Sequence, residues 1–196
     1  MSSPPVKIGI TGTHSTGKSS FFEALEAELK QLNLRVCRIG DFAIKAEALG
    51  FRILRDHTFE STLWIMAECM RLEAEASLSS DVILVDRPVL DALGYLRAAL
   101  ELTGRTIGER RQAALTAMVA AHMPDYDVFI KTSLDPRIEL GAGRDKDSDF
   151  RKAAARWIEQ LAYVLAPVPL TLTSSNQAEI LRTVIDRVAT RLSASK

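Results

Sequence analysis

Short apolar runs alternate with longer amphipathic segments along almost the whole chain. The apolar runs are rich in Val and Ile, as is typical of buried β-strands. They predict strands at Lys7–Thr11, Arg35–Ile39, Val82–Val85, Val128–Lys131 and Val168–Thr171. The amphipathic segments repeat apolar residues three and four positions apart. They predict helices at Lys18–Leu32, Phe59–Ser79, Val89–Leu100, Ile107–His122, Asp149–Leu165 and Gln177–Leu192.

This alternation predicts an α/β fold with three layers, in which a five-stranded parallel sheet lies between two layers of helices. No linker or repeat divides the sequence, so we expect a single domain over residues 1–196. One stripe of the helix predicted at Phe59–Ser79 is expected to face the core. Its members are Leu63, Met66, Ala67, Met70 and Ala74.

The composition narrows the class of protein. Apolar residues make up 47% of the chain and charged residues 26%, which is ordinary for a globular domain. The formal net charge is zero, which argues against a broad electrostatic surface for duplex nucleic acid. The two cysteines and three histidines show no metal-ligand spacing. No signal peptide or membrane-spanning stretch is visible, so we expect a cytoplasmic protein.

The most specific motif lies directly after the first predicted strand. Residues 12–19 spell G-x-x-x-x-G-K-S, the phosphate-binding loop or Walker A motif. Gly12 and Gly17 allow the backbone to approach phosphate oxygens, and the successive amides form an anion-binding nest. Lys18 is predicted to neutralise the β- and γ-phosphates, and the Ser19 hydroxyl to bind Mg²⁺.

The surroundings of this motif fit the prediction, because a strand leads into it and a helix leaves it. The alternative is an ordinary Gly-rich turn, which does not explain the Gly-Lys-Ser ending. ATP and Mg²⁺ are therefore the expected cofactors, and the fold is predicted to be that of the P-loop NTPases. The remaining residues expected to contact the nucleotide are His14, Ser15, Thr16 and Ser20.

A second group of candidates follows the third predicted strand. Asp86 ends the apolar run Val82–Val85, which is the Walker B arrangement for holding Mg²⁺. Strands also end in Asp at ordinary turns, which is the alternative for this residue. Arg87 brings a planar cation to the same end of the sheet, where it could bind phosphate or form a surface salt bridge.

Asp41 ends the second predicted strand and has two interpretations. Its carboxylate could accept the proton of an acceptor hydroxyl or hold that hydroxyl in line. It could equally cap a helix that starts near Phe42. The sequence leaves both open.

The segment 134–150 is polar, contains glycine and is highly charged, which predicts either an active-site lid or a solvated loop. As a lid it would supply arginines to the transferred phosphoryl group, with Arg144 preferred and Arg137 next. Arg151 and Lys146 are further candidates, although Arg151 could pair with Asp147 instead.

With these motifs in order, the chain resembles the P-loop kinases of the thymidylate kinase and deoxynucleoside kinase group. The resemblance is strongest to the compact NadR-like branch, which includes ribosylnicotinamide kinases and "AAA domain" proteins. The matching stretches are residues 12–19, 63–68 and 85–95, the last with the pattern Asp-Arg-x-x-x-Asp-x-x-x-Tyr. The resemblance implies that Asp86 and Arg87 handle Mg²⁺ and phosphate, that Asp41 stands near the base, and that homodimers are common.

We therefore expect ATP- and Mg²⁺-dependent phosphoryl transfer to a small acceptor, most simply a nucleoside or nucleotide. One alternative is a kinase that acts on a nucleobase hydroxyl in nucleic acid or on another metabolite. Another is a regulatory ATP- or GTP-binding switch, although the guanine-reading Asn-Lys-x-Asp segment is missing from the sequence.

Overall fold

The computed structural model describes residues 4–12, 18–132 and 147–194. Its five strands form one sheet in the order β2-β3-β1-β4-β5, and all neighbours are parallel. The strands are β1 (Val6–Thr11), β2 (Val36–Ile39), β3 (Val82–Asp86), β4 (Val128–Thr132) and β5 (Leu170–Leu172). This confirms the predicted five-stranded parallel sheet.

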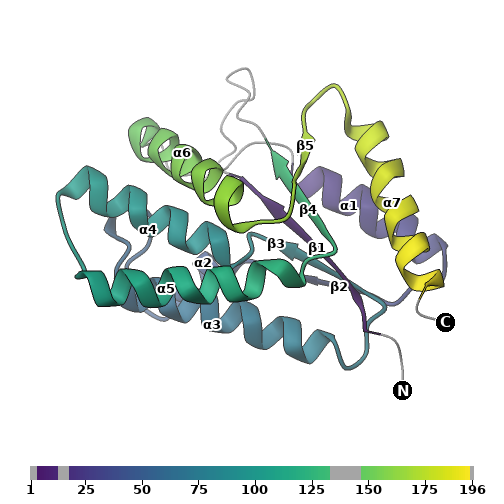
Figure 1. The fold of residues 1–196 in the computed structure, drawn as a ribbon, viewed down its shortest axis with the longest axis horizontal. Helices are drawn as coiled ribbons and strands as arrows, with labels where there is room; N and C mark the ends of the chain where they lie inside the picture. Colours follow the sequence, from purple (N-terminus) through teal and green to yellow (C-terminus); the bar gives the residue numbers. More distant parts are fainter. Residues whose placement is uncertain (1–3, 13–17, 133–146, 195–196) are drawn as a thin grey trace.

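Helices cover both faces of this sheet (Figure 1). The α-helices are α1 (Lys18–Gln31), α2 (Phe42–Ala48), α3 (Phe59–Ala76), α4 (Val89–Thr103), α5 (Glu109–His122), α6 (Ser148–Leu165) and α7 (Gln177–Ser193). Two short 3₁₀ helices, η1 (Leu54–Asp56) and η2 (Met123–Asp125), complete the described elements. None of the described helices combines the length and apolar character needed to cross a membrane.

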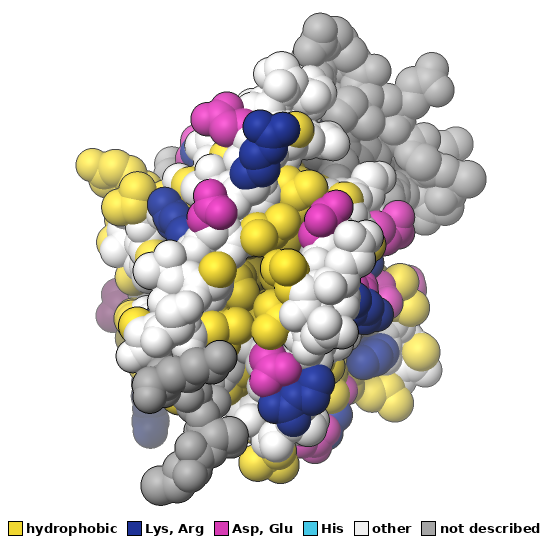
Figure 2. All heavy atoms as spheres, turned by 90° about the vertical axis from the view of Figure 1, so that its right-hand side faces the viewer, with side chains coloured by type: hydrophobic (Ala, Val, Ile, Leu, Met, Phe, Trp, Pro, Cys, Tyr) yellow, Lys and Arg dark blue, Asp and Glu magenta, His cyan; other side chains and the backbone are white. Residues whose placement is uncertain are grey.

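The side chains of β3 show why a separate apolar core lies on each face of the sheet. Successive side chains of a strand point to opposite faces. Val82 and Leu84 pack with α1 and α7, whereas Ile83 and Val85 pack with α3, α4 and α6. All four side chains are fully buried, which explains the unbroken apolar run in the sequence. Figure 2 shows apolar side chains gathered at the centre of the end of the molecule that carries α1 and α7.

The strand order decides which loops meet. Because β3 pairs with β1, Asp86 lies beside Ile10 in the register, one residue before the end of β1. The carboxyl ends of β1, β2 and β3 therefore lie at one edge, next to the start of α1.

Three sequence predictions need correction. The predicted stripe of α3 is correct for Met66, which is buried, and for Met70, which packs against the core, but wrong for Leu63, Ala67 and Ala74, which are exposed. The last strand begins at Leu170 and not at Val168, which is 90% exposed. Helix α4 runs three residues beyond Leu100 and ends before Gly104, whose φ of 66° is typical of a helix terminus.

The buried face of α3 is partly polar, which explains the first of these errors. Its buried residues are Ser61, Thr62, Ile65, Met66, Cys69, Glu73 and Ala76. The polar members are bonded: Ser61 closes a capping box with Thr58, and Glu73 accepts bonds from two other segments. Hydrophobic spacing alone does not detect a face that includes satisfied polar groups.

Candidate functional site

The phosphate loop begins where β1 leaves the sheet. Gly12 has a φ of 131°, and a Cβ at this position would collide with Oγ1 of Thr132 on β4. Only glycine fits this combination of backbone angle and close contact. Four predicted nucleotide contacts, His14, Ser15, Thr16 and Gly17, lie outside the described residues.

Lys18 is the first residue of α1, and its side chain folds back across the start of the loop. Its Nζ donates to the Gly12 carbonyl oxygen at 2.8 Å, and the residue is only 6% exposed. Ser19 and Ser20 are exposed in the first turn, which contains no acidic residue. The positive end of the α1 dipole is therefore not neutralised within its own first turn, which favours an anion there.

Asp86 lies at the carboxyl end of β3, as the sequence predicts. Its Oδ1 is buried and makes no hydrogen bond, while its Oδ2 lies 3.9 Å from Nη2 of Arg38. The tip of β2 approaches closely, since a Cβ on Gly40 would lie 3.1 Å from Cβ of Asp86. A buried carboxylate oxygen without a donor fits a site that a cation or its water ligand would complete.

Arg87 adopts a backbone conformation that is rare for residues with a side chain. Its φ is 67°, and its backbone N–H donates to the Ile10 carbonyl oxygen at 3.0 Å. Its Nη1 donates to the Tyr95 hydroxyl at 2.7 Å and lies 3.8 Å from Oδ2 of Asp91. Such unusual angles persist only where the surroundings hold them, and they concentrate at functional sites.

Asp91 joins these parts, although the sequence analysis gave it no role. It is 2% exposed on α4, and its Oδ1 accepts a hydrogen bond from the Thr11 hydroxyl. Burial raises the pKa of Asp91 to about 6, while Arg87 and Thr11 pull it down. The sequence signal was the spacing of Asp91 and Tyr95, which puts both on one side of α4, with Arg87 four residues before Asp91.

Asp41 stands at the N-cap position of α2 with a φ of 59°, and its side chain makes no capping hydrogen bond. The side chain is exposed, next to Gly40 and therefore near the end of β3. The capping interpretation thus lacks the bond that would support it.

The lid arginines Arg137 and Arg144, together with Lys146, lie outside the described residues. Just after this segment, Asp147 caps α6 by accepting from the N–H groups of Asp149 and Phe150. Its side chain also pairs with Arg55 of η1 at 2.7 Å.

The residues present fit Mg²⁺ better than a metal held by protein side chains alone. In the described part of the chain, no group of three or more His, Cys, Asp or Glu side chains could hold a metal ion. Mg²⁺ bound with a nucleotide needs only one or two protein oxygens, because phosphates and water supply the rest. Ser19 and Asp86 offer such oxygens.

Solved structures of three proteins share this fold at low sequence identity. They are the NadR protein in complex with NR, thymidylate kinase from Candida albicans, and deoxyadenosine kinase from M. mycoides with bound dATP. Their identities are 12, 13 and 12%, and their TM-scores 0.65, 0.66 and 0.58. The matches cover 94, 97 and 92% of this chain, and 52, 93 and 100% of the respective structures. The chain thus spans about half of the NadR protein.

No curated protein matches the chain. A family model described as "AAA domain" matches residues 7–179, from the second residue of β1 into the first turn of α7. This match contains the phosphate-loop motif, the Asp-Arg pair and all of the parallel sheet except the first residue of β1. The chain therefore belongs to the AAA domain family.

Proposed function

We propose that this protein is a P-loop kinase that transfers the γ-phosphoryl group of ATP, with Mg²⁺, to a nucleoside or nucleotide. The observation that carries the proposal is the arrangement around Asp91. Its buried carboxyl contacts Thr11 at the start of the phosphate loop and lies beside Arg87, while Lys18 closes over Gly12. These contacts connect the loop that would bind the nucleotide with the guanidinium of Arg87, which follows the neighbouring strand β3.

Each residue has a distinct part in the proposal. Lys18 and the loop amides bind the phosphates, and Ser19 and Asp86 hold Mg²⁺, which neutralises phosphate charge when bound. Arg87, supported by Tyr95 and Asp91, presents its guanidinium to a phosphoryl oxygen. Catalysis then depends mainly on orientation and on fixed charges.

A second set of residues would serve the acceptor. Asp41 is exposed at the tip of β2, where its carboxylate could accept the proton of an acceptor hydroxyl. Arg144 or Arg137 would add positive charge to the transferred group from the lid. A nucleoside-like acceptor agrees with the three similar structures, which are the NadR protein in complex with NR, a thymidylate kinase and a deoxyadenosine kinase. We further propose a cytoplasmic protein that forms a homodimer.

The test is ADP release from ATP and Mg²⁺ with a panel of nucleosides, nucleoside monophosphates and pyridine ribosides. Lys18→Ala removes the charge at the loop and should lower acceptor-dependent release at least about a hundredfold. Lys30→Ala, at the exposed far end of the same helix, serves as the matched control and should retain the rate.

Release that requires one member of the panel and disappears in Lys18→Ala would establish a kinase and identify its acceptor class. Slow hydrolysis that is the same with every acceptor would contradict the proposal. It would favour a regulatory nucleotide switch or a macromolecular acceptor.

A further inference from the structure

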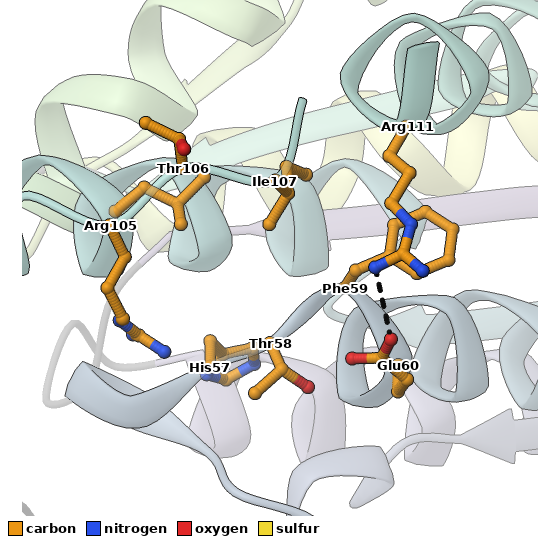
Figure 3. A pocket seen from close by; sticks show the side chains of 9 residues that line it. His57, Thr58, Phe59, Glu60, Arg105, Thr106, Ile107 and Arg111 are labelled. Atoms are coloured by element: carbon orange, nitrogen blue, oxygen red, sulfur yellow. Dashed lines mark hydrogen bonds and ion pairs between the residues drawn. The ribbon is translucent and has the colours of Figure 1, made fainter. Parts of the chain in front are cut away.

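A pocket of about 290 Å³ lies between the start of α3 and the connection from α4 to α5. Figure 3 shows Arg105 and Arg111 at its two sides, with Ile107 between them and His57 and Thr58 opposite. Leu100, nine residues after Asp91 on α4, also lines the pocket. Nine helical residues correspond to roughly 13 Å along the axis, which separates this pocket from the candidate phosphate site.

Arg105 brings a positive charge that no carboxylate within the described ranges pairs with. Its Nε donates to the Thr103 hydroxyl at 2.8 Å, and its Nη2 donates to the Arg55 carbonyl oxygen at 2.9 Å. Both partners are neutral oxygens, so they orient the guanidinium without compensating its charge. The Nη1 group keeps its donors for another acceptor, in a fork that is already oriented.

The neighbouring groups do not cancel this charge. His57 is 2% exposed, its Nδ1 lies 3.0 Å from the Leu54 carbonyl oxygen, and burial lowers its pKa to about 4. The ring is therefore neutral at pH 7. Arg111 lies over the Phe59 ring, with 4.7 Å from Cζ to the ring centroid, and pairs with Glu60 at 3.3 Å. The charges of Arg111 and Glu60 cancel, so Arg105 leaves one net positive charge at the pocket.

The remaining walls are apolar. Phe59, Leu100 and Ile107 are half-buried and contribute ring and aliphatic surface, while Thr106 adds an exposed hydroxyl at the rim. A small pocket with apolar walls and one oriented cation is suited to a ligand with a flat apolar group and a single negative end.

We propose that this pocket is a second binding site, which takes a small organic anion, a carboxylate or phosphate monoester that carries an apolar ring or chain. The anionic group binds Arg105, and the apolar group lies against Phe59, Leu100 and Ile107. The site is distinct from the phosphate loop, and the proposal does not depend on the kinase activity.

His57, in the wall of the pocket, also contacts Tyr95, the residue that supports Arg87. The His57 ring lies 5.9 Å from the Tyr95 ring, and the Tyr95 hydroxyl accepts the bond from Arg87. Likewise, Arg105 holds the carbonyl of Arg55, whose side chain pairs with Asp147 at the start of α6. An anion in the pocket would therefore touch His57 and Arg105, which contact Tyr95 and Arg55.

The experiment is a ¹H–¹⁵N NMR titration of the full chain with benzoate, and with benzamide as the neutral molecule of the same shape. Benzoate up to about 20 mM should shift the amide signals of residues 57–60 and 105–111, with an affinity in the millimolar range. Arg105→Gln should weaken binding about tenfold or more, because it removes a charged hydrogen-bond donor. Arg110 is an exposed residue of α5 that does not line the pocket, so Arg110→Gln should change the affinity for benzoate less than about twofold.

Two further variants locate the site. Thr106→Asp adds a negative charge at the rim without touching the core and should also weaken benzoate binding. Lys18→Ala should leave it unchanged. The proposal is overturned if no pocket signal moves at the highest concentration, if benzamide binds as well as benzoate, or if Lys18→Ala abolishes binding. Equal affinities of the Arg105→Gln and wild-type proteins would overturn it too.

Discussion

Single residues set the chemistry at the carboxyl end of the sheet, and Asp91 is the most informative of them. A carboxyl that is 2% exposed and has one oxygen without a hydrogen bond is costly to keep. It is bonded to Thr11 and lies beside Arg87, so the cost is offset where the proposed phosphate groups would lie. In the proposed kinase, Asp91 would therefore be a positioning residue for Arg87 and for the start of the phosphate loop.

The first prediction concerns Asp91→Asn. Asparagine keeps the shape and a bond to Thr11 but loses the charge beside Arg87, so kcat should fall about tenfold. The raised pKa, about 6, also predicts an acid limb near pH 6 in the wild-type rate profile, because protonation neutralises Asp91. The variant should lack that limb, as pH–rate profiles of both proteins would reveal.

The same pKa has a consequence for stability. The pKa of Asp91 is higher in the folded protein than the unfolded value of 3.8, so the folded protein binds the proton more tightly. Protonated Asp91 therefore contributes to the free energy of unfolding at low pH. This contribution is lost as the pH rises through about 6, and the wild-type protein should lose stability relative to Asp91→Asn over that range. Asp186→Asn, an exposed carboxylate of α7, is the control and should show no such trend. Parallel pH dependences for all three proteins would refute the assignment.

At the scale of elements, the contact between α4 and α6 holds Asp91 and Tyr95 in place. Gly94 lies between these two residues, and a Cβ on it would come within 2.5 Å of Cγ1 of Ile158 on α6. The absence of a side chain is what lets the two helices approach so closely.

Gly94→Val is therefore expected to lower the free energy of unfolding by about 2 kcal/mol or more, since the added methyl groups overpack a buried contact. The loss would appear as a lower midpoint in urea unfolding. Ala113→Val makes a similar change on the exposed face of α5 and should cost only about 0.5 kcal/mol. Comparable losses in the two variants would mean that α4 and α6 do not pack as described.

At the scale of the whole molecule, Glu73 ties together segments that are distant in sequence. Its carboxylate lies 3.3 Å from Lys7 Nζ and 2.9 Å from His122 Nε2, and accepts from the Tyr126 hydroxyl at 2.5 Å. These partners come from β1, the end of α5 and the residue after η2, at the end of β1 away from the phosphate loop. The cluster fixes the layer of α3 and α5 on the sheet.

Glu73→Gln should lower the free energy of unfolding by about 3 kcal/mol at pH 7. The variant removes the buried negative charge that Lys7, His122 and Tyr126 contact. Burial raises the pKa of Glu73, but bonds from His122 and Tyr126 outweigh it and leave the pKa below 4.5. The carboxylate therefore stabilises the fold above about pH 4.5, and this contribution is lost as the pH falls through the lower folded-state pKa.

The difference in the free energy of unfolding between the wild-type protein and Glu73→Gln should thus shrink below about pH 4.5, which chemical unfolding at several pH values would measure. Glu75→Gln changes an exposed acid on the same helix and should cost less than about 1 kcal/mol at any pH. A difference that stays constant down to pH 3 would show that the Glu73 charge does not stabilise the fold.

The sequence predicted the larger part of this fold. Each strand and each long helix was found, with ends within about three residues, because strands covered on both faces read as unbroken apolar runs. The seven-residue α2 was anticipated only as an alternative role for Asp41. The buried face of α3 was found only in part, because Ser61, Thr62 and Glu73 are polar residues that hydrogen bonds make compatible with burial.

The sequence by itself determined the phosphate loop and the strand-end residues Asp86 and Arg87, since these depend on residue type, spacing and local backbone. Only the tertiary structure decided what surrounds them. The order of the strands puts Asp86 beside Ile10, and the packing of α4 brings Asp91 to Thr11. The pocket at Arg105 likewise joins residues about 50 positions apart. Local patterns do not encode such contacts, because each depends on how separate elements bury their faces against one another.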